Sequence, residues 1–377
     1  MICFLRKQKY LIDYILSSLL RNKGKNFALL AVYTLIIFML ASVMLFTHAL
    51  RKEAVNMLEN APEIIVQRLQ AGRNALVPSE YLDKIGKLRG VTQKSGRLWG
   101  YYYDPAVKAN YTVMTAGQES LPITEIIIGA GIARTRGLSL GDYLTLRSQS
   151  GDAYAFKVSK LLDERSELVT TDLLLISPLA FRRLFNIPEG VYSDLVLSVR
   201  NPREVRKVAE KLVLMLPDSR PILREEILRT YDSIFSWREG VIFVLLMGSV
   251  LAFMIFAWDK ASGLSAEERR EIGILKAVGW ETSDVMRMKF WEGAIISLMA
   301  FLLGYLAAYA HVFFASASLF EPVLKGWAVL YPSFQLTPVV DGLQLATLFF
   351  FTVLPYILAT IIPVWRTSIT DPDAVMR

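Results

Sequence analysis

The stretch ERREIGILKAVG, residues 268–279, is a dense cluster of charges that runs into an apolar helical repeat. It lies between two apolar windows, residues 241–258 and 294–315, neither of which contains Asp, Glu, Lys or Arg. Windows of this length and composition can cross a bilayer. The cluster is therefore confined to one face of a membrane, where a short amphipathic element is suited to docking a soluble partner.

The composition places the whole chain in a membrane. Of its 377 residues 53% are hydrophobic, the mean hydropathy is +0.37, and two further windows, residues 27–46 and 343–365, also lack charged residues. A lysine at the centre of a membrane helix costs about 2.5 to 3.5 kcal/mol, whereas a strongly apolar residue returns only about 0.3 to 0.6 kcal/mol, so charge-free windows decide the assignment. The sequence predicts an integral membrane α-helical protein with four transmembrane helices.

Basic residues in the short segments set the orientation. Six precede the first window against one Asp, six more lie between the second and third windows, and the connection at 316–342 contains only Lys325. By the positive-inside rule, both termini and the segment 259–292 lie in the cytoplasm. The first apolar run is longer than the core of a signal peptide, so we expect it to be retained as a span.

These assignments divide the chain into nine parts. The long segment between the first two spans is predicted to lie outside the membrane as a large mixed α+β domain. The predicted divisions are a cytoplasmic amphipathic helix (1–26), transmembrane helices at 27–48, 239–258, 293–315 and 343–365, the extracytoplasmic domain (49–238), a cytoplasmic coupling segment (259–292), an extracytoplasmic loop (316–342) and a cytoplasmic tail (366–377).

The extracytoplasmic domain depends on its own hydrophobic core, because the only cysteine, Cys3, lies on the cytoplasmic side. Apolar spacing predicts helices over Pro78–Arg89 and Pro202–Met215. Short runs of β-branched and apolar residues bounded by turn residues predict strands. The predicted strands are Glu63–Gln67, Tyr111–Thr115, Ile123–Ile128, Tyr143–Arg147, Ala155–Ser159, Leu173–Ile176 and Asp194–Val199.

The chemical motifs indicate no enzyme. The sequence contains no phosphate-binding G-x-x-x-x-G-K-[ST] loop and no HExxH pattern or Cys/His cluster, and His48 and His311 are predicted to be interfacial residues at the outer ends of spans. Gly129-Ala130-Gly131 begins like a dinucleotide fingerprint, but Arg134 stands where the third glycine is needed, so we interpret it as a structural turn. The net charge of +7 follows from topology and does not indicate nucleic-acid binding. Energy for any work must come from another chain.

Four blocks of sequence carry a family resemblance that covers nearly the whole chain. They are LSSLLRNK at 16–23, IIGAGIARTRGLSLGD at 127–142, the opening cluster with its sequel through Glu292, and IPVWR at 362–366 followed by DPDAVMR at 371–377. In this combination the chain resembles the FtsX/MacB/LolC-like permeases of ABC transporters, also called type VII or mechanotransmission systems.

The resemblance implies a permease subunit that couples ATP hydrolysis by a separate ATPase to motion of its extracytoplasmic domain, for export or for lipid or lipoprotein handling at the outer face of a bacterial cytoplasmic membrane. ATP and Mg²⁺ would then bind the ATPase, with no cofactor in this chain. The implied partners are two ATPase subunits, a second permease copy or a paralogue, the lipid membrane, and an extracytoplasmic adaptor, carrier or hydrolase. The implied ATPase-coupling residues are Glu268, Arg269, Arg270, Glu271, Ile272, Gly273, Leu275, Lys276, Ala277 and Gly279.

The pattern of the cluster agrees with this implication. Ile272, Leu275 and Val278 recur at three-residue spacing, which predicts one apolar stripe on a helix. Gly279 is placed to end that helix in a left-handed conformation, and Thr282 or Ser283 to cap the next helix, which continues into the third span. The alternative is a solvated loop that sets topology on lipid headgroups. We interpret the amino-terminal helix as a membrane anchor rather than an ATPase contact.

Several departures from the family pattern leave the cargo open. The connection 316–342 is long and aromatic for a loop that is often brief, and the exported domain is smaller than the two-lobed domain of exporter members. Two other functions also stay open. One is an FtsX-like regulator of a cell-wall hydrolase, which would show a compact protein-binding surface outside the membrane, and the other is a receptor that works without an ATPase.

Overall fold

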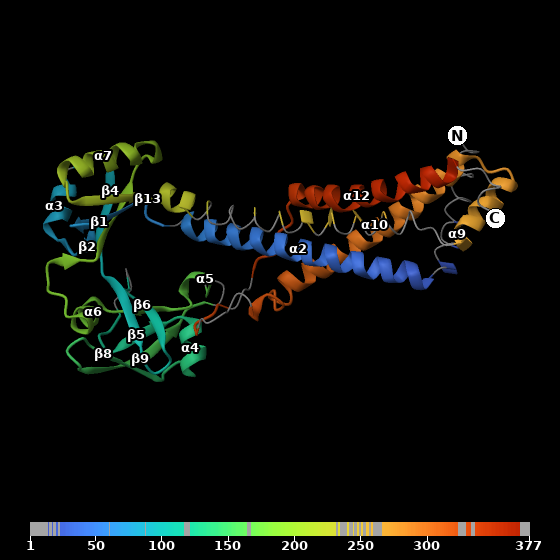
Figure 1. Cartoon of the computed structure of the whole chain (residues 1–377). Coiled ribbons are helices and arrows are strands. Elements are labelled where there is room, and N and C mark those ends of the chain that lie inside the picture. Colours follow the sequence, from blue (N-terminus) through green and yellow to red (C-terminus); the bar gives the residue numbers. More distant parts are fainter. Residues whose placement is uncertain are drawn as a thin grey trace. The chain divides into compact units, whose positions relative to one another are not determined.

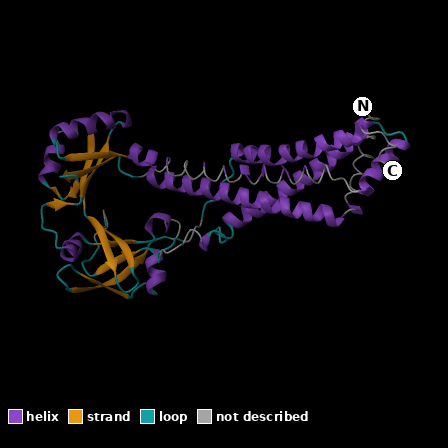
Figure 2. Cartoon of the chain, viewed as in Figure 1, coloured by secondary structure: helices purple, strands orange, loops and turns teal. Residues whose placement is uncertain are grey.

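The computed structural model describes the chain in two compact units. One unit is Met1–Leu50, Phe235–Ala317 and Thr337–Arg377, and the other is Arg51–Ile234 and Ser318–Leu336. Figure 1 labels the elements, and Figure 2 shows that the strands are gathered in one part of the chain, which is the second unit. The described residues are 14, 17, 20, 21, 23–59, 61–86, 88–116, 121–163, 167–230, 233, 240, 244, 247, 248, 250, 251, 254, 255, 258, 266–322, 329–332 and 336–369.

Among the described residues, three long helices are apolar enough to cross a membrane: α2 (Lys23–Glu59), α10 (Thr282–Phe313) and α12 (Gly342–Ile369). They contain the candidate spans Asn26–Glu53, Thr282–Phe313 and Gly342–Ile361. These agree with the predicted spans one, three and four. The predicted span at 239–258 lies mostly outside the described residues, although the positions described within it are helical. It stays a prediction.

The helix α2 continues well beyond the membrane. Its 37 residues form a helix about 55 Å long, against about 30 Å for a hydrocarbon core. It ends at Glu59, and the first strand, β1 (Ile64–Gln70), follows almost at once.

Small residues let α10 pack closely against both other helices. A Cβ added at Gly304 would lie 2.9 Å from the Ile37 side chain and from the carbonyl oxygen of Thr34 on α2. A Cβ added at Gly293 would lie 3.1 Å from the hydroxyl oxygen of Thr360 on α12. Membrane helices associate through such close contacts because lipid provides no hydrophobic driving force. The glycines of α10 therefore set how tightly the three helices pack.

A larger side chain at Gly304 should separate α2 from α10. We expect Gly304→Leu to lower the free energy of unfolding of the helix bundle by about 1 to 3 kcal/mol, the usual cost of overpacking. The measurement is thermal unfolding of the full chain in detergent. The matched control is Gly24→Leu, since a Cβ at Gly24 meets no atom within 4 Å. Equal melting of the two variants would contradict this packing.

His311, which was predicted to be an interfacial residue at the outer end of a span, lies near the end of α10 and is buried. Its side chain is buried in the bundle, with Nδ1 3.3 Å from the hydroxyl oxygen of Ser42 on α2 and the ring edge-on to Phe38. Two other buried hydroxyls also bond inside the bundle: Ser297 donates to the Ala294 carbonyl and Thr352 to the Leu348 carbonyl. A polar group in lipid must find such a partner. Ser297 and Thr352 bond within their own helices, whereas the contact between His311 and Ser42 links α10 to α2.

The second unit has two separate hydrophobic cores, so it is two-lobed, contrary to the smaller domain expected from the sequence. The first lobe is a sheet of strand order β13-β1-β12-β4, with β2 paired to β1. Its core gathers apolar side chains of the strands and of α7, among them Ile64, Leu197 and Leu212. The elements are β2 (Arg73–Ala75), β3 (Val77–Pro78), α3 (Glu80–Ile85), β4 (Val91–Arg97), β11 (Val191–Tyr192), β12 (Asp194–Val199), the 3-10 helix Pro202–Glu204, α7 (Val205–Met215) and β13 (Ser219–Leu223), with β3 paired to β11.

The second lobe is a six-stranded sheet that curls toward closure. Its order is β5-β6-β10-β7-β9-β8, and the two edge strands are bridged where the backbone N–H of Arg147 donates to the Tyr102 hydroxyl at 2.9 Å. Tyr111, Phe156 and Leu174 are among the side chains that fill the enclosed core. The elements are β5 (Trp99–Asp104), β6 (Ala109–Thr115), β7 (Glu125–Ile128), α4 (Ala130–Arg136), β8 (Tyr143–Arg147), β9 (Ala153–Leu161), α5 (Glu167–Thr170), β10 (Leu173–Ile176) and α6 (Pro178–Phe185).

The second lobe is inserted into the first. The chain enters it between β4 and β5 and returns to the first lobe at β11 and β12. At this junction the backbone N–H of Trp99 donates to the Ser193 hydroxyl at 2.9 Å, and that hydroxyl donates to the Trp99 carbonyl at 2.8 Å. Two strand connections, tied to each other by one serine, thus join the lobes.

Candidate functional site

The predicted coupling cluster forms α9 (Ala266–Ala277), which ends in a tight turn before α10. Gly279 has φ +101°, in the left-handed region. The N–H of Trp280 donates to the Leu275 carbonyl and the N–H of Gly279 to the Lys276 carbonyl, each at 3.0 Å. This pair of bonds is a Schellman motif, with the usual apolar contact between Trp280 and Leu275. The prediction that Gly279 ends the helix is confirmed.

One face of α9 is fixed to the start of α10. Ile272 is only 4% exposed and packs with the fully buried Val285. One turn further on, Leu275 packs against Met288. These apolar contacts join α9 and α10 into one corner. A push on α9 is therefore transmitted directly to the helix that forms the predicted third span.

The last turn of α9 and the residue that follows it expose apolar side chains on the opposite face. Ile274 is 52% exposed and Val278 76% exposed, and Ala277 between them is also exposed. Residues four apart lie on the same side of a helix. The predicted stripe of Ile272, Leu275 and Val278 is therefore wrong at its last member, because Val278 faces away from the other two.

The remaining predicted site residues of α9 differ in burial. Gly273 is buried and Lys276 is half-buried. The backbone of Glu268, Arg269, Arg270 and Glu271 lies within α9, and their side chains are outside the described residues. Sequence reasoning omitted Ile274 and Val278 from the site. A helical repeat applied from Ile274 could have found them, because 274 and 278 are four residues apart.

The start of α10 differs from the prediction that Thr282 or Ser283 caps it. Glu281 occupies the capping position, and its carbonyl accepts the N–H groups of Asp284 and Val285. The hydroxyl of Ser283 donates to the Glu281 carboxylate at 3.2 Å. The sequence therefore placed the start within two residues but named the wrong cap. The continuation of this helix through Phe313 is confirmed.

Among the few amino-terminal residues that the structure describes, Tyr14 contacts the corner. The ring of Tyr14 lies 5.8 Å from that of Trp280, centroid to centroid, and packs in the same cluster as Met288. Interpretation as a membrane anchor alone missed this contact. The apolar stripe predicted for this helix consists of the Leu and Ile residues at 11, 12, 15, 16, 19 and 20, so only the aromatic character of Tyr14 could have indicated the contact.

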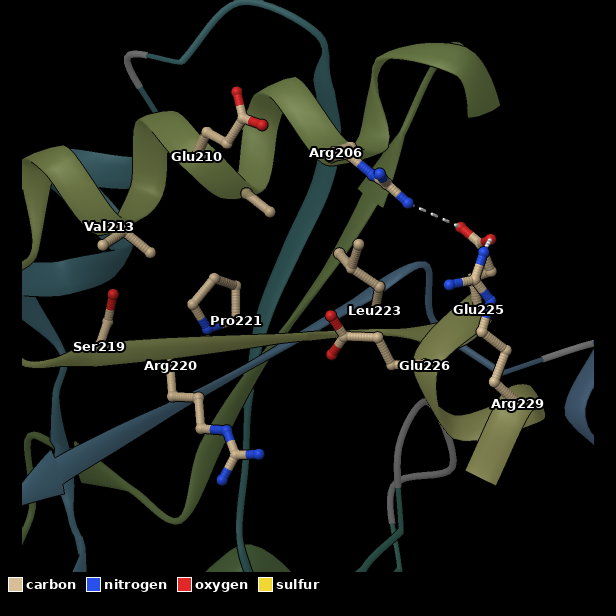
Figure 3. Close-up of a pocket in the computed structure, with 11 residues that line it drawn as sticks. Arg206, Glu210, Val213, Ser219, Arg220, Pro221, Leu223, Glu225, Glu226 and Arg229 are labelled. Atoms are coloured by element: carbon tan, nitrogen blue, oxygen red, sulfur yellow. Dashed lines mark hydrogen bonds and ion pairs between the residues drawn. The ribbon is translucent and has the colours of Figure 1, made fainter. Parts of the chain in front are cut away.

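The first lobe also has an open groove, of about 520 Å³, between α7 and β13 (Figure 3). Charges of both signs line it, and Glu225 pairs with Arg206 at 3.7 Å and with Arg229 at 2.5 Å. The eleven lining residues include no His or Cys. Within the described part of the chain, no group of three or more His, Cys, Asp or Glu side chains is arranged to hold a metal ion. The groove offers no catalytic set.

The free edge of β13 beside this groove is poorly suited to receive another strand. In the register with β1, Pro221 is paired with Val66, and the bonded pairs fall on the neighbouring positions. An N–H at 221 would therefore point away from β1, and proline has none. The neighbouring outward donor, the N–H of Ser219, is already bonded to the Leu216 carbonyl. α9 is thus the stronger candidate site.

Comparison with known proteins finds similarity to ABC transporter permeases. Residues 239–372, which include α9 and its flanking helices, match the family FtsX-like permease C-terminal. An uncharacterized ABC transporter permease of Methanocaldococcus jannaschii is 24% identical over 191 residues, which are 47% of this chain and 45% of that protein. The chain thus matches about half the length of this relative.

Two solved structures of extracytoplasmic regions are weakly similar to this chain. One is the extracellular domain of the noncanonic ABC-type transporter YknZ from Gram-positive bacteria, with TM-score 0.30, 12% identity, and coverage of 42% of this chain and 98% of that one. The other is the periplasmic region of MacB from Actinobacillus actinomycetemcomitans, with TM-score 0.32, 9% identity, and coverage of 47% and 98%. Scores this low do not establish a shared fold.

Proposed function

We propose, because residues 239–372 match the family FtsX-like permease C-terminal, that the chain is the membrane subunit of an ABC transporter whose separate ATPase docks on α9. The observation that carries the proposal is the two-sided character of α9. Its inner face is packed onto α10 through Ile272 and Leu275, while Ile274 and Val278 on its outer face are uncovered. A solvated loop on headgroups needs no such rigid support.

The mechanism is mechanical. Closure of two ATPase subunits on ATP moves α9, and the corner with α10 passes this movement into the membrane helices. The long helix α2 then delivers movement to the exported lobes, since it runs from the bundle almost to β1. The apolar windows of the predicted spans contain no charged residues, so we place the cargo outside, at the lobes or their junction with the outer leaflet, rather than in a channel.

The assembly follows from the same premise. We propose two ATPase subunits with two permease chains, identical or paralogous, in the cytoplasmic membrane with both termini inside. Export or lipoprotein handling is the leading activity. Regulation of a wall hydrolase would use the same coupling with a different outer partner, whereas a receptor without an ATPase would leave the outer face of α9 without a partner.

The docking face is tested by introducing negatively charged side chains into it. We expect Ile274→Glu with Val278→Glu to reduce co-purification of an ABC ATPase from native membranes at least about tenfold, since each interface anchor is worth more than about 1 kcal/mol. The ATPase is identified by mass spectrometry and by nucleotide hydrolysis. Leu214→Glu, an equally apolar and exposed site on α7, is the matched control and should change nothing.

A second variant disrupts the turn instead of the face. Gly279→Pro with Arg270→Glu should abolish ATPase association while membrane insertion is kept, because proline cannot adopt φ +101° and removes the N–H that bonds to Lys276. Recovery of the ATPase at wild-type yield with both the charged face and the broken turn would rule out the docking assignment.

A further inference from the structure

The two exported lobes are connected to the membrane helices by different routes. The first lobe follows α2 directly at β1, and after β13 the chain continues as a helix at 224–230 toward the predicted second span. The second lobe is an insertion between β4 and β11, so the backbone links it only to the first lobe. Any direct attachment of the second lobe to the membrane helices must therefore be a non-covalent contact.

Such a contact exists in the connection between α10 and α12. Within the unit that contains both lobes, Leu330 packs against the core of the second lobe. The next residue, Tyr331, accepts a hydrogen bond at its carbonyl from Nη2 of Arg134, at 2.8 Å. This is the connection whose length and aromatic content depart from the family pattern, and these contacts give it a use.

Arg134, which donates this hydrogen bond, is itself held in place by an ion pair. Arg134 lies on α4 and is paired with Glu167 of α5, whose side chain is 0% exposed. Glu167 also accepts the hydroxyl of Thr171 at 3.3 Å. A buried carboxylate is costly unless it is paired, so Glu167 keeps the guanidinium at this position. The hydrogen bond to Tyr331 therefore comes from a donor with little freedom to turn away.

The side chain of Tyr331 is also partly buried. Burial, and secondarily the nearby Glu321, raises the pKa of the Tyr331 hydroxyl to about 12. A tyrosine free in water would show no such effect. Residues 330 and 331 are both half-buried.

We propose that residues 329–332 act as a strap that fastens the second lobe to α10 and α12, with Leu330 as its apolar anchor and Arg134 as its clasp. The first lobe then follows α2 while the second lobe follows the other two helices. Movement of α10 relative to α2 changes the angle between the lobes at their junction near Trp99 and Ser193. This role rests on the proposed function, because α9 is what moves α10.

The docked state of the strap is tested by cysteine labelling of the full chain in lipid nanodiscs. The only native cysteine is removed by Cys3→Ser, and a water-soluble maleimide is the probe. Leu330→Cys should react at least about tenfold more slowly than Val329→Cys, the exposed neighbouring position, since a docked residue reacts only through local opening. Equal rates would overturn the docked strap.

The clasp is tested in the same assay. Arg134→Met should raise the labelling rate of Leu330→Cys to that of Val329→Cys. Its matched control is Arg136→Met, on the same helix, which breaks the 3.4 Å pair with Asp104 but touches no strap residue. Acceleration by both variants, or by neither, would show that Arg134 is not the clasp.

The mechanical role is tested by the distance between the lobes. Spin labels at Leu214→Cys on the first lobe and Leu140→Cys on the second, both exposed, report it by pulsed electron resonance. Leu330→Asp releases the anchor and leaves the Arg134–Glu167 pair intact, so it should broaden the distance distribution, while Arg136→Met should not. A distribution unchanged by Leu330→Asp would refute the strap.

These experiments use the permease without any ATPase. They can therefore fail while ATPase docking on α9 succeeds, and the reverse also holds. If the strap is docked but the α9 variants leave co-purification intact, the lobe contact stands and the proposed coupling does not.

Discussion

Gly129→Ala should strongly destabilise the second lobe where α4 packs against α5. A Cβ at this position would lie 1.9 Å from the carbonyl oxygen of Thr170 and 2.9 Å from that of Thr171. Both obstacles are backbone, so no side chain can rotate out of the way. Overpacking usually costs about 1 to 3 kcal/mol, and we expect more than about 3 kcal/mol here, because α4 and α5 would have to separate.

The effect is measured by hydrogen exchange of the full chain, with peptides of the first lobe as an internal reference. Peptides from α4, β7 and β10 should lose protection while those from β1 and β12 keep it. The matched control is Gly151→Ala, at φ +95° with no atom within 4 Å of the added Cβ. That variant meets only the left-handed strain of about 1 to 2 kcal/mol. Equal loss in both variants would show that space at Gly129 is not the limiting factor.

The same geometry explains the glycine motif that begins like a dinucleotide fingerprint. A Cβ at Gly131 would lie 2.4 Å from the Thr171 hydroxyl oxygen, and the N–H of Gly129 donates to the Leu173 carbonyl at 2.8 Å. The glycines let α4 approach the chain before β10. These contacts give both glycines a packing role.

Asp194→Ala should loosen the junction between the lobes. The side chain of Asp194 is buried, and it accepts two bonds from Arg97, at 2.8 and 2.7 Å, and one from the indole N–H of Trp99 at 2.8 Å. Breaking a buried pair on one side leaves the other partner unsatisfied, so we expect a loss of about 3 kcal/mol. Exchange of the amides on both sides of Leu98 should rise together, and the interlobe distance should vary more widely.

The control is a similar pair that is less buried. The carboxylate of Asp218 accepts hydrogen bonds from Nε of Arg68 and from the hydroxyl of Tyr81, each at 2.7 Å, and its side chain is 36% exposed. Asp218→Ala should cost no more than about 1 kcal/mol, as solvent screens such pairs. Bonds from Tyr81 and Arg68 hold the pKa of Asp218 below its usual value. Its contribution is thus present at neutral pH and lost as the pH falls through that lowered pKa. A larger loss at Asp218 than at Asp194 would contradict the assignment of the junction.

Strands that pack one face into a core could be read from the sequence. The predictions for 143–147, 173–176 and 194–199 coincide with β8, β10 and β12, because apolar residues there alternate or run continuously. The strands β4 and β13 were missed. β4 (VTQKSGR) is largely polar and lies at a sheet edge, and β13 contains Pro221. An edge strand needs only one partner and little burial, so its sequence carries little periodicity.

The candidate site shows where pattern reasoning fails on a helix. Ile272, Leu275 and Val278 are three apart, but a helix turns about 100° per residue, so each step of three falls about 60° short of a full circle. After two steps Val278 has left the face of Ile272, and the structure shows it exposed. The four-residue step from Ile274 to Val278 keeps to one face.

What the sequence by itself determined was the membrane character of the chain, three spans that the structure bears out, and the turn at Gly279. Each follows from local composition or from the conformation open to a single residue. Only the tertiary structure decided which face of α9 is free, that the second lobe is inserted into the first, and that Arg134 reaches Tyr331 across 197 positions. These features depend on contacts between residues far apart in the chain, and neither hydropathy nor periodicity records which distant partner a side chain will meet.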